Sequence, residues 1–292
     1  MSMSYLIGIL FAFAALFLWG GGDFLIQRTT RHIGDWETLF LIVGIGTVVL
    51  TPFVYTQIAG YPSIPSILIV LVLAGVLGFF ASMLFLESLR RGKIAAVEPM
   101  MALEIPVVAV MSLFIISEIL SPLEILLVVA IMVGLILVSL SEEHLKHFRL
   151  ERGVLLMVAA AILFGASAFF VGYGARLSNP IFVNWFAGLV IAILTFAYLL
   201  FNGNMHKLMR NTLKFPKLVL ATALIDTFAW VSFAFASVLI PITIAVALSE
   251  NYIGVAALLG LLLNREKLVV HQKAGFAVAL FSAVALSLLI WG

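Results

Sequence analysis

Three carboxylic acids lie deep inside long apolar stretches of the sequence. Glu104 and Asp226 are each the tenth residue of such a stretch, and Glu250 lies similarly deep in another. An ionised carboxylate at the centre of a membrane helix costs about 2.5–3.5 kcal/mol on insertion scales, so such a group usually faces a cavity or a partner. No Lys, Arg or His lies at comparable depth. We therefore expect the three acids to share an acidic cavity in which they hold a proton or attract a substrate's amine. The alternative is that each stays neutral and hydrogen-bonds neighbouring helices together.

Aromatic and amide side chains could complete a site around these acids. Trp19, Trp230 and Tyr252 are candidates for stacking on a substrate or for holding a cation against a ring face. Asn184 and Asn251 are candidate polar wall residues, because a buried amide needs hydrogen-bond partners. These five residues join the three acids as the predicted substrate- and proton-binding set.

Proline and glycine indicate where the acid-bearing stretches can bend. Pro106 removes the backbone hydrogen bond to residue 102, so a kink is expected there, and Pro99 should disturb the first turns of the same stretch. Gly254 lies four residues beyond Glu250 and could serve a matching bend. Pro106, Pro99 and Gly254 are therefore the predicted hinges of an alternating-access motion.

The overall composition indicates an integral membrane protein. Hydrophobic residues make up 64% of the 292 residues and charged residues 10%, too few charges to cover a soluble surface. The net charge of +2 does not favour nucleic-acid binding, and the absence of Cys excludes disulfides and thiolate sites. All five His fall in the loops or at the very start of an apolar stretch, without a completing ligand set, so no metal site and no cofactor are expected.

The apolar stretches divide the chain into ten segments, each close to the length that spans about 30 Å of hydrocarbon. The predicted helices are residues 5–27, 36–58, 67–89, 95–117, 122–140, 153–175, 180–201, 217–238, 240–263 and 270–291.

The loop charges predict an orientation. Every Lys and Arg except Arg176 falls in the loops or the adjoining first turns on one side of these ten segments, including Arg28 and Arg31 after the first. The basic side is expected to face the cytoplasm, which would place both termini outside the cell membrane.

Two halves of the chain, residues 1–145 and 150–292, each contain five predicted helices. An odd number inverts the second half relative to the first, and inverted repeats are a known transporter architecture with substrate bound near the midplane. The segments that match between the halves are residues 19–24 and 164–169, and residues 117–124 and 265–272. Glu118 and Glu266 in the second pair are expected to cap the helices that follow them.

The same segments resemble the motifs of a transporter family. Leu18-Trp19-Gly20-Gly21-Gly22-Asp23-Phe24 is similar to a Trp-Gly-Ser-Asn-Phe pattern. A second family pattern, Pro…Gly-Glu…Gln…Gly, is approximated by Pro106, Ser117-Glu118, Glu124 and Gly134, and again by Arg265-Glu266, Gln272 and Gly275. On these residues the chain resembles the EamA-like, ten-helix branch of the drug/metabolite transporter superfamily. The resemblance implies a carrier of small metabolites, often an exporter of amino acids or similar solutes.

These observations predict an all-α membrane protein that acts as a secondary transporter and not as an enzyme. The expected cargo is an amino acid, an amine or a related small solute, exported or exchanged with coupling to protons. The alternatives are a membrane-embedded lipid-modifying enzyme or, among carriers, a multidrug or organic-anion exchanger. We expect a monomer in the lipid bilayer, with a weak homodimer as the alternative, and no nucleic-acid partner.

Overall fold

The computed structural model describes residues 3–58, 60–91, 98–139, 152–202, 208, 212–253, 255 and 269–291. Side chains are described for these residues except 62, 89–91, 98 and 99. All regular structure within this part of the chain is helical. The elements of the first half are α1 (Met3–Ile33), α2 (Asp35–Val54), η1 (Tyr61–Ser63), α3 (Pro65–Arg91), η2 (Glu98–Leu103), α5 (Glu104–Ile116) and α6 (Pro122–Ser139). Those of the second half are α8 (Arg152–Leu177), α9 (Pro180–Phe201), α11 (Pro216–Leu239), α12 (Ile242–Ser249) and α14 (Val270–Trp291).

Local chemistry fixes the ends of several helices. Asn179 caps α9 by accepting hydrogen bonds from the backbone N–H groups of Ile181 (2.8 Å) and Phe182 (3.4 Å). Ser121 and Glu124 form a reciprocal capping box at the start of α6. Gly34 separates α1 from α2 with φ = 117°, a left-handed conformation that favours glycine. These residues thus fix where α2, α6 and α9 begin.

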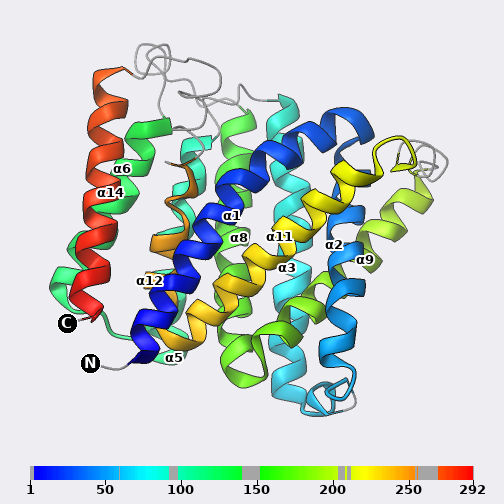
Figure 1. The fold of residues 1–292 in the computed structure, drawn as a ribbon, viewed down its shortest axis with the longest axis horizontal. Coiled ribbons are helices and arrows are strands. Elements are labelled where there is room, and N and C mark those ends of the chain that lie inside the picture. The colour runs from blue at the N-terminus through cyan, green and yellow to red at the C-terminus, as the bar shows by residue number, and fades with distance from the viewer. Residues whose placement is uncertain are drawn as a thin grey trace.

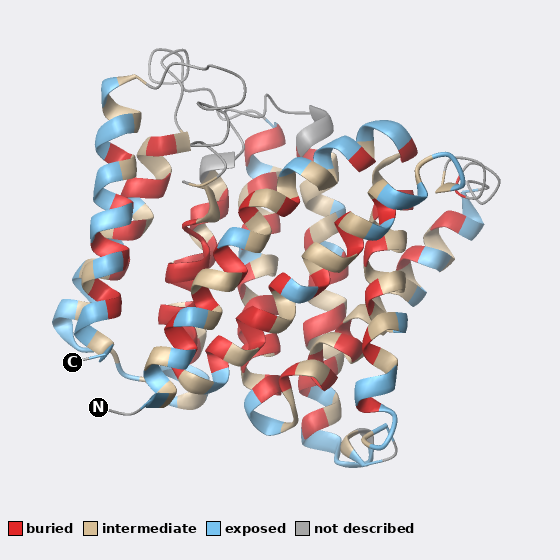
Figure 2. Cartoon of the chain, in the orientation of Figure 1, coloured by how far each residue is buried: buried red, intermediate tan, exposed pale blue. Residues whose placement is uncertain are grey.

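The molecule has the architecture of a multi-pass membrane protein. Within the described residues, eight helices are long and apolar enough to cross a bilayer: α1, α2, α3, α6, α8, α9, α11 and α14. Buried residues gather at the centre of the bundle, and exposed residues lie mainly along the outer helices and at the helix ends (Figure 2). Large apolar side chains such as Leu126 and Phe281 are exposed on this outer face, where lipid replaces water as the neighbour.

The two halves pack against each other in an exchanged pattern. Helix α1 lies along α11, and α3 lies along α8, which is the same pairing with the halves interchanged. Three further pairs join a segment to its own counterpart: α2 to α9, α5 to α12 and α6 to α14. The α6–α14 pair stands at one edge of the bundle and the α2–α9 pair at the other (Figure 1). This pattern is that of a two-fold axis in the membrane plane, and the predicted ten-helix fold of two inverted five-helix repeats is confirmed.

The first predicted boundary is wrong at its C-terminal end. Helix α1 continues to Ile33, so Arg28, Arg31 and His32 belong to its last turns and not to a loop. Basic side chains are favourable at a helix C-terminus, and the chain turns only at Gly34.

The fourth predicted helix, residues 95–117, is not continuous. A 3₁₀ segment, η2, occupies Glu98–Leu103, and the α-helix α5 begins at Glu104. Pro106 therefore lies in the first turn of α5, where its missing N–H breaks no α-helical hydrogen bond. The kink expected at Pro106 is thus a change of helix type just before it.

The ninth predicted helix, residues 240–263, is also interrupted. Helix α12 ends at Ser249 and Glu250 is its C-cap. Beyond it, the N–H of Asn251 donates to the carbonyl of Leu248, and that of Ile253 donates to the carbonyl of Glu250. These tighter bonds replace the α-helical pattern at the position where the first half has its own break. The predicted hinge Gly254 lies outside the described residues.

The contact between α6 and α14 leads to a stability prediction, because the two backbones approach closely at Gly134 and Gly275. A Cβ added at Gly134 would lie 2.7 Å from the backbone nitrogen of Ala279 and 2.8 Å from the carbonyl oxygen of Gly275. Gly134→Ala should therefore lower the free energy of unfolding by about 1–3 kcal/mol, measured as a lower melting temperature in detergent. Gly44→Ala is the matched control, since a Cβ there meets nothing within 4 Å. Equal melting temperatures for the two variants would contradict the close packing.

Candidate functional site

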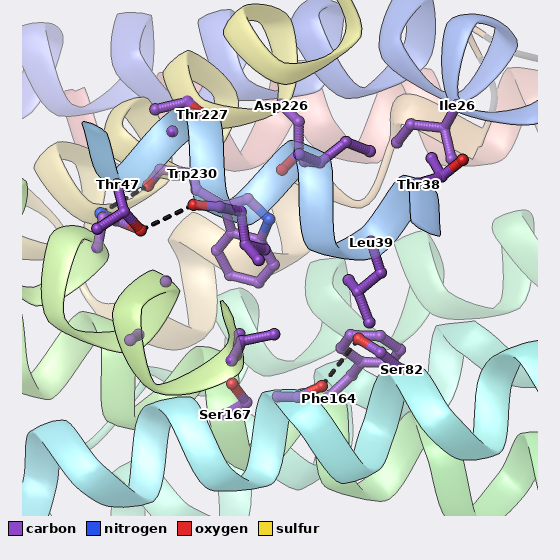
Figure 3. A pocket seen from close by; sticks show the side chains of 18 of the residues that line it. Ile26, Thr38, Leu39, Thr47, Ser82, Phe164, Ser167, Asp226, Thr227 and Trp230 are labelled. Carbon is purple, nitrogen blue, oxygen red and sulfur yellow. Dashed lines mark hydrogen bonds between the residues drawn. The ribbon is translucent and has the colours of Figure 1, made fainter. Parts of the chain in front are cut away.

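A cavity of about 240 Å³ lies between α1, α2, α3, α8, α9 and α11 (Figure 3). Most of its wall is apolar, and the polar lining residues come from all six helices. They are Thr30, Asp35, Thr38, Thr47, Ser82, Ser167, Asn184, Asp226, Thr227 and Trp230. None of the described lining residues is Lys, Arg or His. The cavity is therefore an apolar chamber with acidic and neutral polar groups set into its wall.

The cavity extends along most of the bundle's depth. It begins near Thr30 and Asp35, at the junction of α1 and α2 where basic residues gather. It reaches Leu50 near the end of α2 and Asn184 near the start of α9. The cavity therefore spans most of the length of α2.

The far end of the bundle is joined by a network around Arg176. Its guanidinium donates to the carbonyls of Ser237 (2.7 Å) and Ile240 (2.9 Å) and pairs with Glu118 (2.8 Å). The other oxygen of Glu118 accepts from the N–H of Thr243 at the start of α12 (3.4 Å). The prediction that Glu118 caps the helix after it is therefore wrong. Glu124 occupies that cap, which leaves Glu118 to tie the first half to the second.

Three of the predicted site residues line the cavity. Asp226 lies on α11, and Trp230 follows one turn later on the same helix. They lie across the cavity from Ser167 and Ser82 (Figure 3). Asn184 on α9 donates hydrogen bonds to the carbonyls of Pro180 (2.7 Å) and Trp230 (3.3 Å). Asp226, Trp230 and Asn184 thus lie in the wall of one cavity.

Glu104 and Glu250 lie apart from this lining. Both are buried, with 7% and 6% of their surface exposed, and their carboxyl groups are within electrostatic range of each other. Glu250 also interacts electrostatically with Asp23 of α1. One oxygen of Glu250, Oε2, is buried without a hydrogen-bond partner among the described residues. The structure thus divides the predicted acids between the cavity and a second cluster, Asp23, Glu104 and Glu250, at the two helix breaks.

Trp19 connects the cavity residues with the second cluster. Its ring lies 5.1 Å from that of Trp230 and 6.1 Å from that of Tyr252, measured between ring centroids. Tyr252 follows Glu250 by two residues. Asn251 between them is buried and donates to the carbonyl of Ala247 (2.9 Å). The predicted aromatic residues Trp19, Trp230 and Tyr252 thus form one cluster, and the Asn251 side chain bonds to the last turns of α12.

Gly20 and Gly165, which occupy matching positions in the two halves, let the interrupted helical segments pack closely against α1 and α8. A Cβ at Gly165 would lie 2.9 Å from the carbonyl oxygen of Glu104, and one at Gly20 would lie 3.5 Å from that of Tyr252. These glycines are equivalent in the two halves, so Glu104 corresponds more closely to Tyr252 than to Glu250. Of the predicted hinges, Pro106 is in α5 and Pro99 is the second residue of η2.

Sequence reasoning missed most of the polar lining. Thr30, Thr47, Ser82, Ser167 and Thr227 are ordinary members of apolar stretches, and each hydroxyl bonds a backbone carbonyl. Hydropathy carries no signal for which of them face a cavity. Asp35 had a signal, because it is an acid directly before the second apolar stretch.

The fold is that of a multi-pass membrane protein built from two inverted repeats. The EamA-like transporter family model matches the chain twice, over residues 6–140 and 151–288. The chain belongs to this family, and the predicted membership is confirmed.

The other comparisons add the fold alone. A solved structure described only as "Crystal structure of protein" aligns with a TM-score of 0.70 over 98% of this chain and 99% of that chain, at 17% sequence identity. No curated protein sequence matches the chain significantly.

The Arg176 network generates the second prediction. Arg176→Gln should lower the free energy of unfolding by roughly 1–2 kcal/mol, because Glu118 and two backbone carbonyls lose a charged donor that is itself partly exposed. The measurement is the melting temperature in detergent. Arg152→Gln is the control, since that side chain is exposed at the start of α8. A loss no larger than the control's would show that the network contributes nothing to stability.

Proposed function

We propose that the protein is a proton-coupled secondary transporter of amines, amino acids or related small solutes, and that the described cavity binds the solute. The observation that carries this proposal is Asp226, a carboxylate in the wall of a largely apolar cavity at membrane depth. A charge there is costly unless a proton or a cation neutralises it. The solute's positive group would serve as that cation, with Trp230 beside it as a ring face.

Alternating access would use the two broken helices. Both acid-bearing segments change helix type within the membrane, at Glu104 and at Glu250. Because the two halves pack in an exchanged pattern, they could also adopt a second arrangement with their conformations interchanged, in which the opposite end of the cavity would open. Pro106 and Pro99 beside the first break, and Gly254 after the second, are the proposed hinges.

Proton coupling would use the second acidic cluster. Glu104 and Glu250 are buried within electrostatic range of each other, so carrying both charges at once is unfavourable. The unpartnered Oε2 of Glu250 is a place where a proton can be held. Trp19 and Tyr252 would transmit the state of this cluster to Trp230 in the cavity.

The competing functions are less well supported. An organic-anion exchanger needs cationic side chains in its cavity, whereas the described lining has Asp35 and Asp226 and no basic residue. A lipid-modifying enzyme is disfavoured because the family is one of transporters.

For the setting, we propose the cell membrane with the basic ends of the helices in the cytoplasm, both termini outside and the chain acting as a monomer. The cavity, which begins near Thr30 and Asp35, would then open to the cytoplasm.

Coupling is tested in proteoliposomes that contain a pH-sensitive dye. A panel of small amines and amino acids should drive proton movement in the wild type, after correction for protein-free vesicles. Glu250→Gln should abolish the proton movement because it removes the group that holds the proton, and Asp226→Asn should abolish solute binding. Glu124→Gln, which keeps its capping geometry, is the control. Proton movement of wild-type size in Glu250→Gln would contradict the coupling.

Orientation is tested with single cysteines, since the chain has none of its own. Ser2→Cys should react with an impermeant maleimide added outside intact cells, because the N-terminus is proposed to be external. Asn202→Cys, at the exposed end of α9, should react only after the cells are opened. The reverse labelling pattern would invert the orientation.

A further inference from the structure

The hydroxyl groups in the cavity wall have already used their hydrogens. Each of five lining hydroxyls donates to a backbone carbonyl over 2.7–2.8 Å. A hydroxyl has one hydrogen, and a carbonyl oxygen cannot donate, so the direction of each bond is fixed. Toward the cavity, these hydroxyl oxygens can therefore accept a hydrogen bond but cannot donate one. The five are Thr30, Thr47, Ser82, Ser167 and Thr227.

The amide of Asn184 is committed in the same way. Its nitrogen lies 2.7 Å from the carbonyl oxygen of Pro180 and 3.3 Å from that of Trp230. Both partners are acceptors, which requires the NH₂ group to face them and occupies both of its hydrogens. The side-chain oxygen of Asn184 is left as an acceptor in the cavity wall.

The charged groups of the lining are also hydrogen-bond acceptors. Asp226 lines the cavity without a hydrogen bond to another described residue, and Asp35 is a second carboxylate at the end near Thr30. Among the described polar side chains of the lining, only the indole N–H of Trp230 and the hydroxyl of Thr38 have no acceptor within the described residues, and the Thr38 oxygen is fully buried. With so few donors beside two carboxylates, the cavity is a poor site for the carboxylate of a solute.

From this asymmetry we infer that the cavity takes a compact organic ammonium ion that carries no carboxylate. An ammonium group brings several N–H donors and a positive charge to a wall made of acceptors and Asp226. The apolar lining, such as Phe164 and Ile191, accepts a hydrocarbon or single-ring body. A zwitterionic amino acid would place its carboxylate against the same wall, without cationic partners. This inference rests on the proposed function and narrows its substrate class to amines.

The test uses three probes with the same phenylethyl body: phenethylamine, phenylalanine and 3-phenylpropionate. Each is titrated into purified full-length protein in detergent, and the rise in melting temperature is fitted to an affinity. Phenethylamine should stabilise the protein saturably, phenylalanine should bind about tenfold more weakly or worse, and 3-phenylpropionate should have no effect. In Asp226→Asn the affinity for phenethylamine should fall by about tenfold or more, whereas Glu124→Gln should bind like the wild type.

Two results would overturn the inference. One is an affinity for phenylalanine equal to that for phenethylamine, and the other is a failure of phenethylamine to stabilise a wild-type protein that melts cooperatively. The proteoliposome assay described above distinguishes a wrong substrate class from a wrong proposed function. Proton-coupled movement of an amino acid there would leave the transporter intact and remove only the restriction to amines.

Discussion

The hydrocarbon core of a bilayer contains no water, so each polar group of a spanning segment must find its partner inside the protein. Most of this structure follows from that constraint. Hydroxyl groups along the helices donate to their own backbone, and Asn184 spends both amide hydrogens on carbonyls. The few polar groups left over are therefore informative. Two of them are the carboxylate of Asp226 in the cavity and one oxygen of Glu250 at a helix break.

The inverted repeat brings the breaks together while keeping the cavity unequal. Segments η2–α5 and α12 are counterparts, and the motif glycines Gly20 and Gly165 let the equivalent backbones approach. The cavity departs from this symmetry. Helix α11 contributes Asp226, whereas its counterpart α3 contributes no charged side chain to the lining. An acid on α3 opposite Asp226 would repel it, whereas the other carboxylate of the lining, Asp35, lies at the end near Thr30.

Hydropathy was sufficient to predict a helical membrane protein of two inverted five-helix repeats, because the number and order of apolar stretches depend only on position along the chain. The rotation of a helix about its axis is not encoded there, since these helices are apolar on all faces. That is why the sequence could not separate Asp226 from Glu104 and Glu250, or identify Ser167 as a lining residue. The partner of Glu118 was missed for a related reason: Arg176 comes from the other half, and only packing brings the two together.

The central claim is that the charge of the Asp226 carboxylate is neutralised either by a bound proton or by a bound cation. One measurement separates those two states directly. Phenethylamine is added to concentrated protein in weakly buffered detergent solution, and the protons released are counted against the amine bound. The account predicts proton release in proportion to bound amine, which disappears in Asp226→Asn. Binding with no release of protons anywhere in the neutral pH range would contradict it.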